Sequence, residues 1–148
     1  MRFLLVDRIL ELTPGTSIVA QRTVPENEEF FQDHFPGFPV MPGVLLTEMM
    51  GQAAAKCLDA QRLPRGKPML AKILSATFRS WVRPGDTTTL YATIVANDDR
   101  YATAECRLEV EGRVAAQARL FFSFIAADQF APNLRDEVLE AFLQEQSR

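Results

Sequence analysis

The chain has 148 residues, of which 47% are hydrophobic and 24% are charged, so its proportions are those of one globular domain and not of a disordered chain. Its formal net charge of −3 lacks the basic excess of nucleic-acid-binding proteins, and we expect no nucleic-acid partner. No stretch approaches the roughly 18 consecutive apolar residues of a membrane-spanning helix, so we expect no membrane association.

The first third of the chain predicts extended structure followed by a constrained loop. Residues 3–12 are mostly apolar and end at the turn sequence Thr13-Pro14-Gly15, so they predict a strand or a short helix. The β-branched residues within Ser17–Val24 predict a strand. After the polar residues 25–29, the loop at residues 30–43 contains three prolines and two glycines, which restrict its backbone and allow close approach to it.

A buried helix is predicted over residues 43–63. Its apolar residues recur at helical spacing, and three consecutive alanines and two adjacent methionines make nearly every face apolar. A helix that is apolar on all sides belongs inside a domain rather than on its surface.

Four strands are predicted in the second half of the chain, at Met69–Val82, Thr87–Ala96, Tyr101–Val110 and Arg113–Ile125. Turn sequences separate them, and the last two turns suit antiparallel hairpins, so we expect a meander. An amphipathic helix is predicted over residues 132–146. One apolar helix and five or six antiparallel strands bury each other only if the sheet curls round the helix, which predicts a single α+β domain over residues 1–148.

One acid–base pair is suggested by the sequence. His34 is the only histidine, and Glu48 follows it by fourteen residues on the apolar helix. A neutral imidazole can remove a proton from the carbon next to a thioester, and a protonated carboxyl can deliver one to a departing hydroxyl. Because Pro42-Gly43 opens the helix, its free backbone N–H groups can stabilise the negative charge that develops on the thioester oxygen.

Structural explanations exist for each of these residues. His34 alone could be a structural histidine in a proline-rich turn, and Glu48 alone could be a partly exposed helix residue. Most phenylalanines and methionines around the loop are expected to pack in the core, although a lipid-like substrate needs some of them in its pocket. Arg79 and Arg83 beside Trp81 could form a nucleic-acid patch, but a solvated strand end fits the acidic chain better.

The chain resembles the FabZ family of 3-hydroxyacyl-[acyl-carrier-protein] dehydratases. The resemblance is carried by His34-Phe35-Pro36-Gly37-x-Pro39-x-Met41-Pro42-Gly43, by Glu48-x-Met50-x-Gln52-Ala53-Ala54, by the segment from Phe3 to Gly15, and by Val82-x-Pro84-Gly85-Asp86. It is specific over residues 3–86, and the following strands match only by pattern.

The resemblance implies a hotdog fold and a homodimer, with three dimers in some relatives forming a hexamer. Each active site is then shared, so that His34 of one chain faces Glu48 of the other. The Val40 carbonyl is implied to face the histidine and the Gly43 N–H to bind the thioester oxygen. The expected substrate-binding residues are Gly43, Val40, Gly37, Gln52, Phe35 and Met41.

Four positions depart from the family pattern. Asp33 stands where glycine is common and Gly51 where alanine is usual, and the terminal helix extends past the usual end of the family. Asn97-Asp98-Asp99-Arg100 is acidic where many relatives are basic, which argues against docking of an acidic carrier protein there. The candidate docking residues are instead Arg62, Arg65, Lys67, Arg79 and Arg83, with Lys72 as a further basic residue.

We therefore expect a lyase that removes water from a (3R)-3-hydroxyacyl thioester carried on acyl carrier protein, without a metal or organic cofactor. The alternatives are a hotdog thioesterase, which would release a free thiol, and a non-catalytic acyl-binding or assembly subunit. A FabA-type dehydratase-isomerase would have aspartate at the position of Glu48. Fatty-acid synthesis and a specialised acyl pathway both remain open.

A cytoplasmic location is expected. Cys57 and Cys106 lie far apart without metal-type spacing, which suits two buried reduced thiols. The segment Met1–Val6 is like the start of a signal peptide, but Asp7 and Arg8 interrupt its apolar run.

Overall fold

The computed structural model describes residues 1–129 and 135–147. Its elements in chain order are β1 (Arg8–Thr13), β2 (Ser17–Thr23), the 3₁₀ helix η1 (Glu29–Gln32), α1 (Gly43–Asp59), β3 (Lys67–Phe78), β4 (Thr87–Asn97), β5 (Tyr101–Val110), β6 (Arg113–Ile125), the 3₁₀ helix η2 (Ala127–Gln129) and α2 (Glu137–Gln146).

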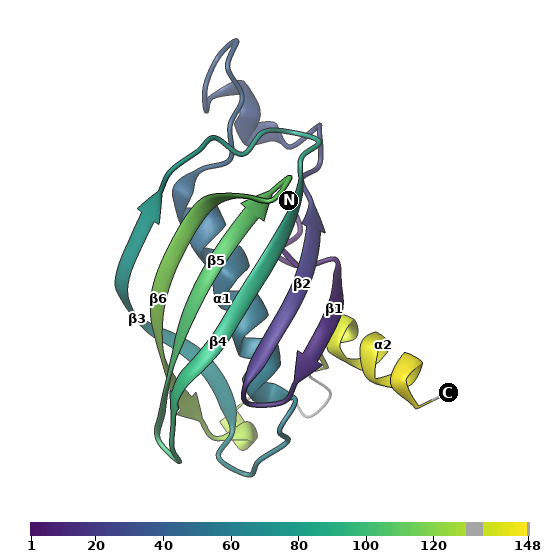
Figure 1. The fold of residues 1–148 in the computed structure, drawn as a ribbon, viewed down its shortest axis with the longest axis vertical. Helices are drawn as coiled ribbons and strands as arrows, with labels where there is room; N and C mark the ends of the chain where they lie inside the picture. The colour runs from purple at the N-terminus through teal and green to yellow at the C-terminus, as the bar shows by residue number, and fades with distance from the viewer. Residues whose placement is uncertain (130–134, 148) are drawn as a thin grey trace.

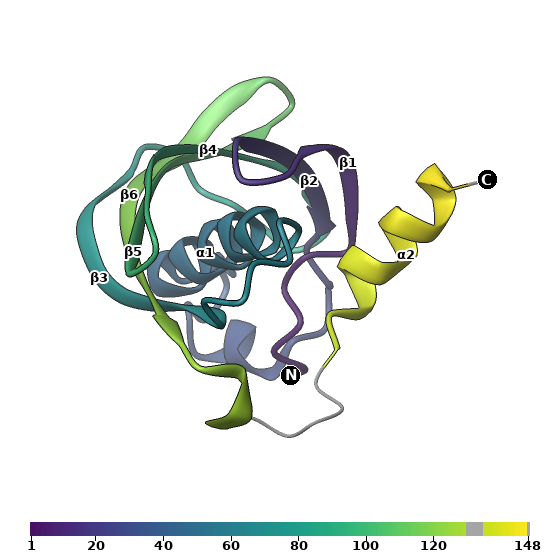
Figure 2. The same ribbon diagram turned by 90° about the horizontal axis from the view of Figure 1, so that it is seen from below.

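Over the described residues, one antiparallel sheet curls around α1 (Figures 1 and 2). The six strands of this sheet lie in the order β1-β2-β4-β5-β6-β3. Seen from below, the curved sheet surrounds α1 on three sides, and the segment before β1 runs along the remaining side (Figure 2). The predicted α+β architecture, a sheet wrapped around an apolar helix, is confirmed.

The prediction that four consecutive strands form a meander is wrong for β3. Strands β4, β5 and β6 are successive neighbours, but β3 pairs with β6 and forms the far edge of the sheet. β3 ends at Phe78 rather than Val82, because the chain then crosses the end of the sheet towards β4 (Figure 1). Within this crossing segment, the Val82 carbonyl accepts a 2.7 Å hydrogen bond from the Met41 amide. This bond joins the crossing segment to residues 30–43, the loop that carries His34, called the histidine loop below.

Helix α1 is the buried helix that the sequence predicts. Met49, Met50, Ala53, Ala54 and Cys57 have no measurable exposure, and they pack against the concave face of the sheet. The helix ends at Asp59 rather than Leu63. A left-handed residue, Arg62 with φ +54°, breaks the helical path there.

The sheet contributes an alternating set of core residues. Along β5 the buried positions are Ala102, Ala104, Cys106, Leu108 and Val110, which is the two-residue period of a strand with one solvated face. Cys57 and Cys106 are free and buried as expected. Burial raises the pKa of the Cys57 thiol to about 11 and that of Cys106 to about 12, so neither serves as a thiolate nucleophile near neutral pH.

The terminal helix begins later than predicted. Residues 132–134 of the predicted helix lie outside the described residues, and α2 starts at Glu137 because Asp136 is its N-cap. The Asp136 carboxylate accepts hydrogen bonds from the backbone N–H groups of Val138 and Leu139, both at 3.1 Å. α2 packs beside β1 on the outside of the sheet (Figure 2). Over the described ranges, none of the helices is both long and apolar enough to cross a membrane.

Candidate active site

The loop that carries His34 lies beyond the amino-terminal end of α1 (Figure 1). Phe31 in η1 is 7% exposed and anchors the loop in the core. Phe35 and Phe38 exchange two backbone hydrogen bonds of 2.8 and 2.9 Å, which close a tight turn. Gly37 occupies a left-handed position of this turn, with φ +74°, where a side chain would strain the backbone.

The imidazole of His34 is held in one orientation. Its Nδ1 lies 3.0 Å from the carbonyl oxygen of Val40, and the Val40 amide donates a 3.0 Å hydrogen bond back to the His34 carbonyl. Since a carbonyl only accepts, Nδ1 carries the hydrogen, and the neutral ring has its lone pair on Nε2. The Phe35 ring stacks on the imidazole with a centroid distance of 4.0 Å. This arrangement suits a base that acts through Nε2.

The start of α1 offers backbone donors next to this loop. Gly43 is the first residue of the helix, and its N-cap Pro42 makes no side-chain capping bond. Within residues 1–129 and 135–147, the Gly43 and Val44 amides donate no hydrogen bond. A Cβ at Gly43 would come within 3.0 Å of the Phe78 ring, so glycine permits the close approach of that ring. The free amides and the helix dipole favour a developing negative charge at this point.

Glu48 lies on the second turn of α1 and is half-buried. Its Oε1 accepts a 3.2 Å hydrogen bond from Nε2 of Gln52, one turn further along the helix. Gln52 is itself fixed, because its Oε1 accepts from the Leu5 amide at 2.8 Å and its Nε2 donates to the Phe3 carbonyl at 3.0 Å. The segment before β1 therefore orients Gln52, and Gln52 orients Glu48. Sequence reasoning missed this link to residues 3–5.

One protomer alone does not join the acid and the base. In the described parts of the chain no hydrogen bond connects His34 with Glu48. Glu48 is five residues into α1, about 7.5 Å along the helix axis from its first residue. The chain thus presents the two groups from two separate elements, the loop and the helix.

The remaining expected site residues, Val40, Met41 and Phe35, differ in exposure, and Phe38 resembles Phe35 in this respect. Val40 and Met41 are buried, at 0% and 6% exposure, so the Met41 side chain packs in the core. Phe35 and Phe38 are 47% and 40% exposed, and both project from the loop surface. Within the described residues no cluster of histidine, cysteine, aspartate or glutamate is arranged to hold a metal ion.

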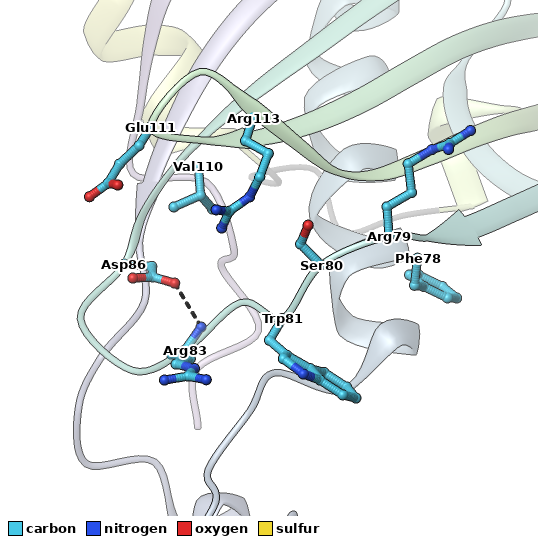
Figure 3. Close-up of a pocket in the computed structure, with 9 residues that line it drawn as sticks. All are labelled: Phe78, Arg79, Ser80, Trp81, Arg83, Asp86, Val110, Glu111 and Arg113. Atoms are coloured by element: carbon cyan, nitrogen blue, oxygen red, sulfur yellow. Dashed lines mark hydrogen bonds between the residues drawn. The ribbon is translucent and has the colours of Figure 1, made fainter.

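A basic cavity of about 670 Å³ lies beside the histidine loop (Figure 3). Figure 3 shows the guanidinium group of Arg113 pointing from the β5–β6 hairpin towards the loop that carries Arg83, whereas the Arg83 side chain extends from that loop away from Arg113. Arg79 also lines the cavity, but it extends away along β6, where its Nε donates to Gln117 at 2.8 Å. The other lining residues are Phe78, Ser80, Trp81, Asp86, Val110 and Glu111.

The cavity is joined to the loop through its aromatic residues. Trp81 meets Phe38 edge to face at 5.7 Å, and the Arg83 guanidinium lies 5.0 Å from the same Phe38 ring. Sequence reasoning named Arg79 and Arg83 but missed Arg113. The Glu111–Gly112 turn was the available signal, because an antiparallel hairpin returns the chain to the end of the sheet where β4 begins.

The second basic group lies at the other end of α1 and is engaged within the chain. Arg62 pairs with Glu140 at 2.7 Å, and Lys67 pairs with Asp59 at 3.2 Å. Arg65 donates to the Asn97 side chain and the Asp98 carbonyl, and it stacks on Phe124. Of the candidate docking residues, the structure places Arg79 and Arg83 in the wall of the cavity beside the histidine loop, together with Arg113.

Comparison with known proteins identifies the family. A profile of the FabA-like domain matches residues 1–119. A protein of Levilactobacillus brevis named 3-hydroxyacyl-[acyl-carrier-protein] dehydratase FabZ is 44% identical over 126 residues, covering 84% of this chain and 85% of the relative. A protein of the same name from Lactobacillus helveticus is 46% identical over 120 residues, covering 80% and 81%. The chain belongs to the FabZ family of dehydratases. Membership of the FabZ family identifies the chain as a hydro-lyase. Helix α2 begins after residue 119, where the match to the FabA-like domain ends.

Solved structures agree with this FabZ-type fold. The PaaI protein of E. coli, from the phenylacetic acid degradation operon, matches with a TM-score of 0.63 and 17% identity, covering 82% of this chain and 80% of that one. The dehydratase heterocomplex ApeI:P of Xenorhabdus doucetiae matches with a TM-score of 0.59 and 19% identity, covering 76% and 92%. These likenesses confirm the predicted hotdog fold.

Proposed function

We propose that the protein dehydrates (3R)-3-hydroxyacyl thioesters on acyl carrier protein to the trans-2-enoyl thioesters, in fatty-acid or related acyl-chain biosynthesis. The observation that carries the proposal is the fixed imidazole of His34, with Nδ1 at 3.0 Å from the Val40 carbonyl, beside the free amide of Gly43. Family membership supports the reaction type.

The reaction divides between the loop and the helix. His34 Nε2 takes the proton from C2 of the substrate, and the electron pair of that C–H bond forms the C2–C3 double bond. The C3–O bond breaks, and the Glu48 carboxyl gives a proton to the leaving hydroxyl, which departs as water. The Gly43 N–H stabilises the charge that develops on the thioester oxygen. The scheme uses no metal ion and no organic cofactor beyond the phosphopantetheine that carries the acyl chain.

The complete site is proposed to form between two copies of the chain. β3 is an unpaired sheet edge, and every residue of it from Met69 to Phe78 is exposed. Its exposed apolar side chains are Met69, Leu70, Ile73, Leu74 and Phe78. A long exposed apolar edge strand favours pairing with another strand. A two-fold pairing with β3 of a second copy would bury this edge. His34 of each protomer would then meet Glu48 of its partner, and dimers could assemble further into hexamers.

The carrier protein is proposed to dock over the basic cavity. Arg79, Arg83 and Arg113 line it beside the histidine loop, and acyl carrier proteins are acidic. At physiological salt, charges within about 8 Å dominate over the net charge of the whole chain. The acidic hairpin at residues 97–100 is not a candidate. Backbone N–H groups of Arg100 and Tyr101 lower the pKa of Asp98, which keeps that carboxylate charged.

A cytoplasmic site of action completes the proposal. The free, buried Cys57 and Cys106 are compatible with a reducing compartment.

Replacement of His34 tests the proposed reaction. His34→Ala is expected to lower the rate of 3-hydroxybutyryl-pantetheine dehydration by about 10²–10⁴, since no other histidine can substitute. The exposed neighbour Gln32 provides the matched control, and Gln32→Ala should keep the parent rate. Near-normal turnover by a folded His34→Ala protein would refute the proposal, and release of free thiol instead of enoyl product would indicate a thioesterase.

A further inference from the structure

Arg22 on β2 is a buried charge outside the proposed site. It follows Ile18 and Ala20 at alternating positions of the strand, so its side chain enters the core face of the sheet and is only 8% exposed. Burying a guanidinium is unfavourable unless partners satisfy it, but its contact with the half-exposed Asp7 is long, at 3.6 Å. Nε of Arg22 has no hydrogen-bond partner among the described residues. Stability alone is therefore a poor explanation for this arginine.

The Arg22 side chain holds the segment that precedes β1. Its Nη1 donates a 2.8 Å hydrogen bond to the Leu4 carbonyl. The residues on either side are bound by Gln52 of α1, which donates to the Phe3 carbonyl at 3.0 Å and accepts from the Leu5 amide at 2.8 Å. This segment is thus held from two directions, by β2 and by α1, on the side of α1 that the sheet leaves open (Figure 2).

The same glutamine continues to the proposed catalytic carboxyl. A side-chain amide has two N–H donors, and Gln52 Nε2 donates both to the Phe3 carbonyl and, at 3.2 Å, to Glu48 Oε1. A shift of the segment before β1 would therefore move the amide and weaken its bond to Glu48. Displacement of a reacting group by about 1 Å can lower a rate on the order of 100-fold. The orientation of Glu48 thus depends on how firmly this segment is fixed.

We propose that Arg22 is a positioning residue for Glu48. It acts through the Leu4 carbonyl, the segment before β1 and Gln52, because its guanidinium fixes the backbone to which Gln52 is bound. This inference rests on the proposed dehydratase function and adds a distant residue to the groups that orient its acid.

A double-mutant cycle with Gln52→Leu tests this role. Arg22→Met keeps an unbranched side chain in the core but removes the donor to Leu4. Alone it should lower kcat for 3-hydroxybutyryl-pantetheine several-fold with a smaller change in KM, and by no more than Gln52→Leu does. In the Gln52→Leu protein it should lower kcat no further, because the link from Arg22 to Glu48 is already lost. Arg22→Lys keeps a charged donor and should retain more activity than Arg22→Met.

Arg8→Met is the matched control. Arg8 lies on the neighbouring strand β1, is exposed and donates to Gln21, so the same exchange should leave kcat at the parent value. Thermal unfolding of each variant establishes that it is folded at the assay temperature. If Arg22→Met does not fold, Arg22→Lys takes its place in the cycle.

The outcomes separate this inference from the proposed function. A folded Arg22 variant with the parent kcat would overturn the positioning role. Losses that multiply when the Arg22 exchange is combined with Gln52→Leu would overturn it as well, since Arg22 would then act independently of Gln52. A parent protein that does not dehydrate 3-hydroxybutyryl-pantetheine would instead overturn the dehydratase proposal.

Discussion

At the scale of single residues, the site depends on which atoms are already engaged. The Val40 carbonyl binds Nδ1 of His34 and leaves Nε2 available for the proposed role as base. Gln52 binds Oε1 of Glu48 and leaves the other carboxyl oxygen available for the proposed contact with the substrate. In both cases a neighbouring group sets the orientation of the side chain that is proposed to react.

Gln52 is expected to act as a positioning residue. Gln52→Leu removes the donor to Glu48 and leaves the Leu5 amide and the Phe3 carbonyl unpaired. We predict that kcat falls about tenfold with a smaller change in KM, because a displaced carboxyl affects the transition state most. Steady-state kinetics over a range of pH check this. A Gln52→Leu protein whose kcat and pH profile match the parent would show that the amide only packs.

The sequence indicated much of this site at the residue scale. His34 and Glu48 stood out because one is a unique histidine and the other is a charged residue on an apolar helix. The contacts of Gln52 with residues 3–5 were not predictable, since they join segments 47 and 49 positions apart. Arg113 differs, because the hairpin turn before it indicated its place at this end of the sheet, although its cavity neighbours at residues 78–86 come from another part of the chain.

At the scale of elements, α2 is tied to the central helix by a buried ion pair. Lys56 Nζ lies 2.9 Å from Asp136 Oδ2, with side-chain exposures of 6% and 18%. Asp136 also caps α2, so one carboxylate serves both helices. Arg62 and Glu140 form a second pair between the same regions, but both side chains are largely exposed.

Removal of Asp136 should therefore destabilise the protein strongly. Asp136→Ala leaves the Lys56 ammonium buried without a partner, and we predict a loss of about 3–5 kcal/mol in the free energy of unfolding. Arg62→Ala, the matched control at the exposed pair, should cost about 0–1 kcal/mol. Urea titrations measure both. Similar losses for the two variants would contradict the predicted importance of the buried ion pair. Adding Lys56→Met to Asp136→Ala should recover part of the lost stability.

Sequence patterns located the elements better than their ends. β5 and β6 have the predicted bounds, because explicit turn sequences flank them. The ends of α1 and β3 and the start of α2 were wrong, because an unusual backbone angle, a crossing of the sheet end and a capping carboxylate set them. The placement of β3 beside β6 reflects the curling of the whole sheet, which no local pattern records.

At the scale of the whole molecule, the two ends of the sheet differ in the charged groups that they present. The histidine loop and the basic cavity share one end, where Phe38 contacts both Trp81 and Arg83. The acidic hairpin at residues 97–100 lies at the other end, together with basic side chains that bind groups of the same chain. Arg65, for example, donates hydrogen bonds to Asn97 and Asp98. In the proposed docking mode, a carrier approaches the first end and meets the Arg83 and Arg113 side chains, which form no ion pair with the described residues.

Reversal of the cavity charges should impair docking without impairing chemistry. Arg83→Glu combined with Arg113→Glu is predicted to raise KM for acyl-carrier substrate several-fold and to change KM for a pantetheine analogue little. Arg100→Glu at the opposite hairpin is the control. If both substrates suffer equally, the arginines support the pocket rather than the carrier, and if neither changes, the carrier docks elsewhere.

We propose that two copies of the chain complete one dehydratase site with His34 from one copy and Glu48 from the other. The most direct measurement mixes His34→Ala and Glu48→Gln proteins, each inactive alone, and follows dehydration of 3-hydroxybutyryl-pantetheine after subunit exchange. A mixed dimer has one site with both defects and one with neither, so activity should return to about half of the parent value per mixed dimer. Proven exchange without any recovered activity would contradict the shared site.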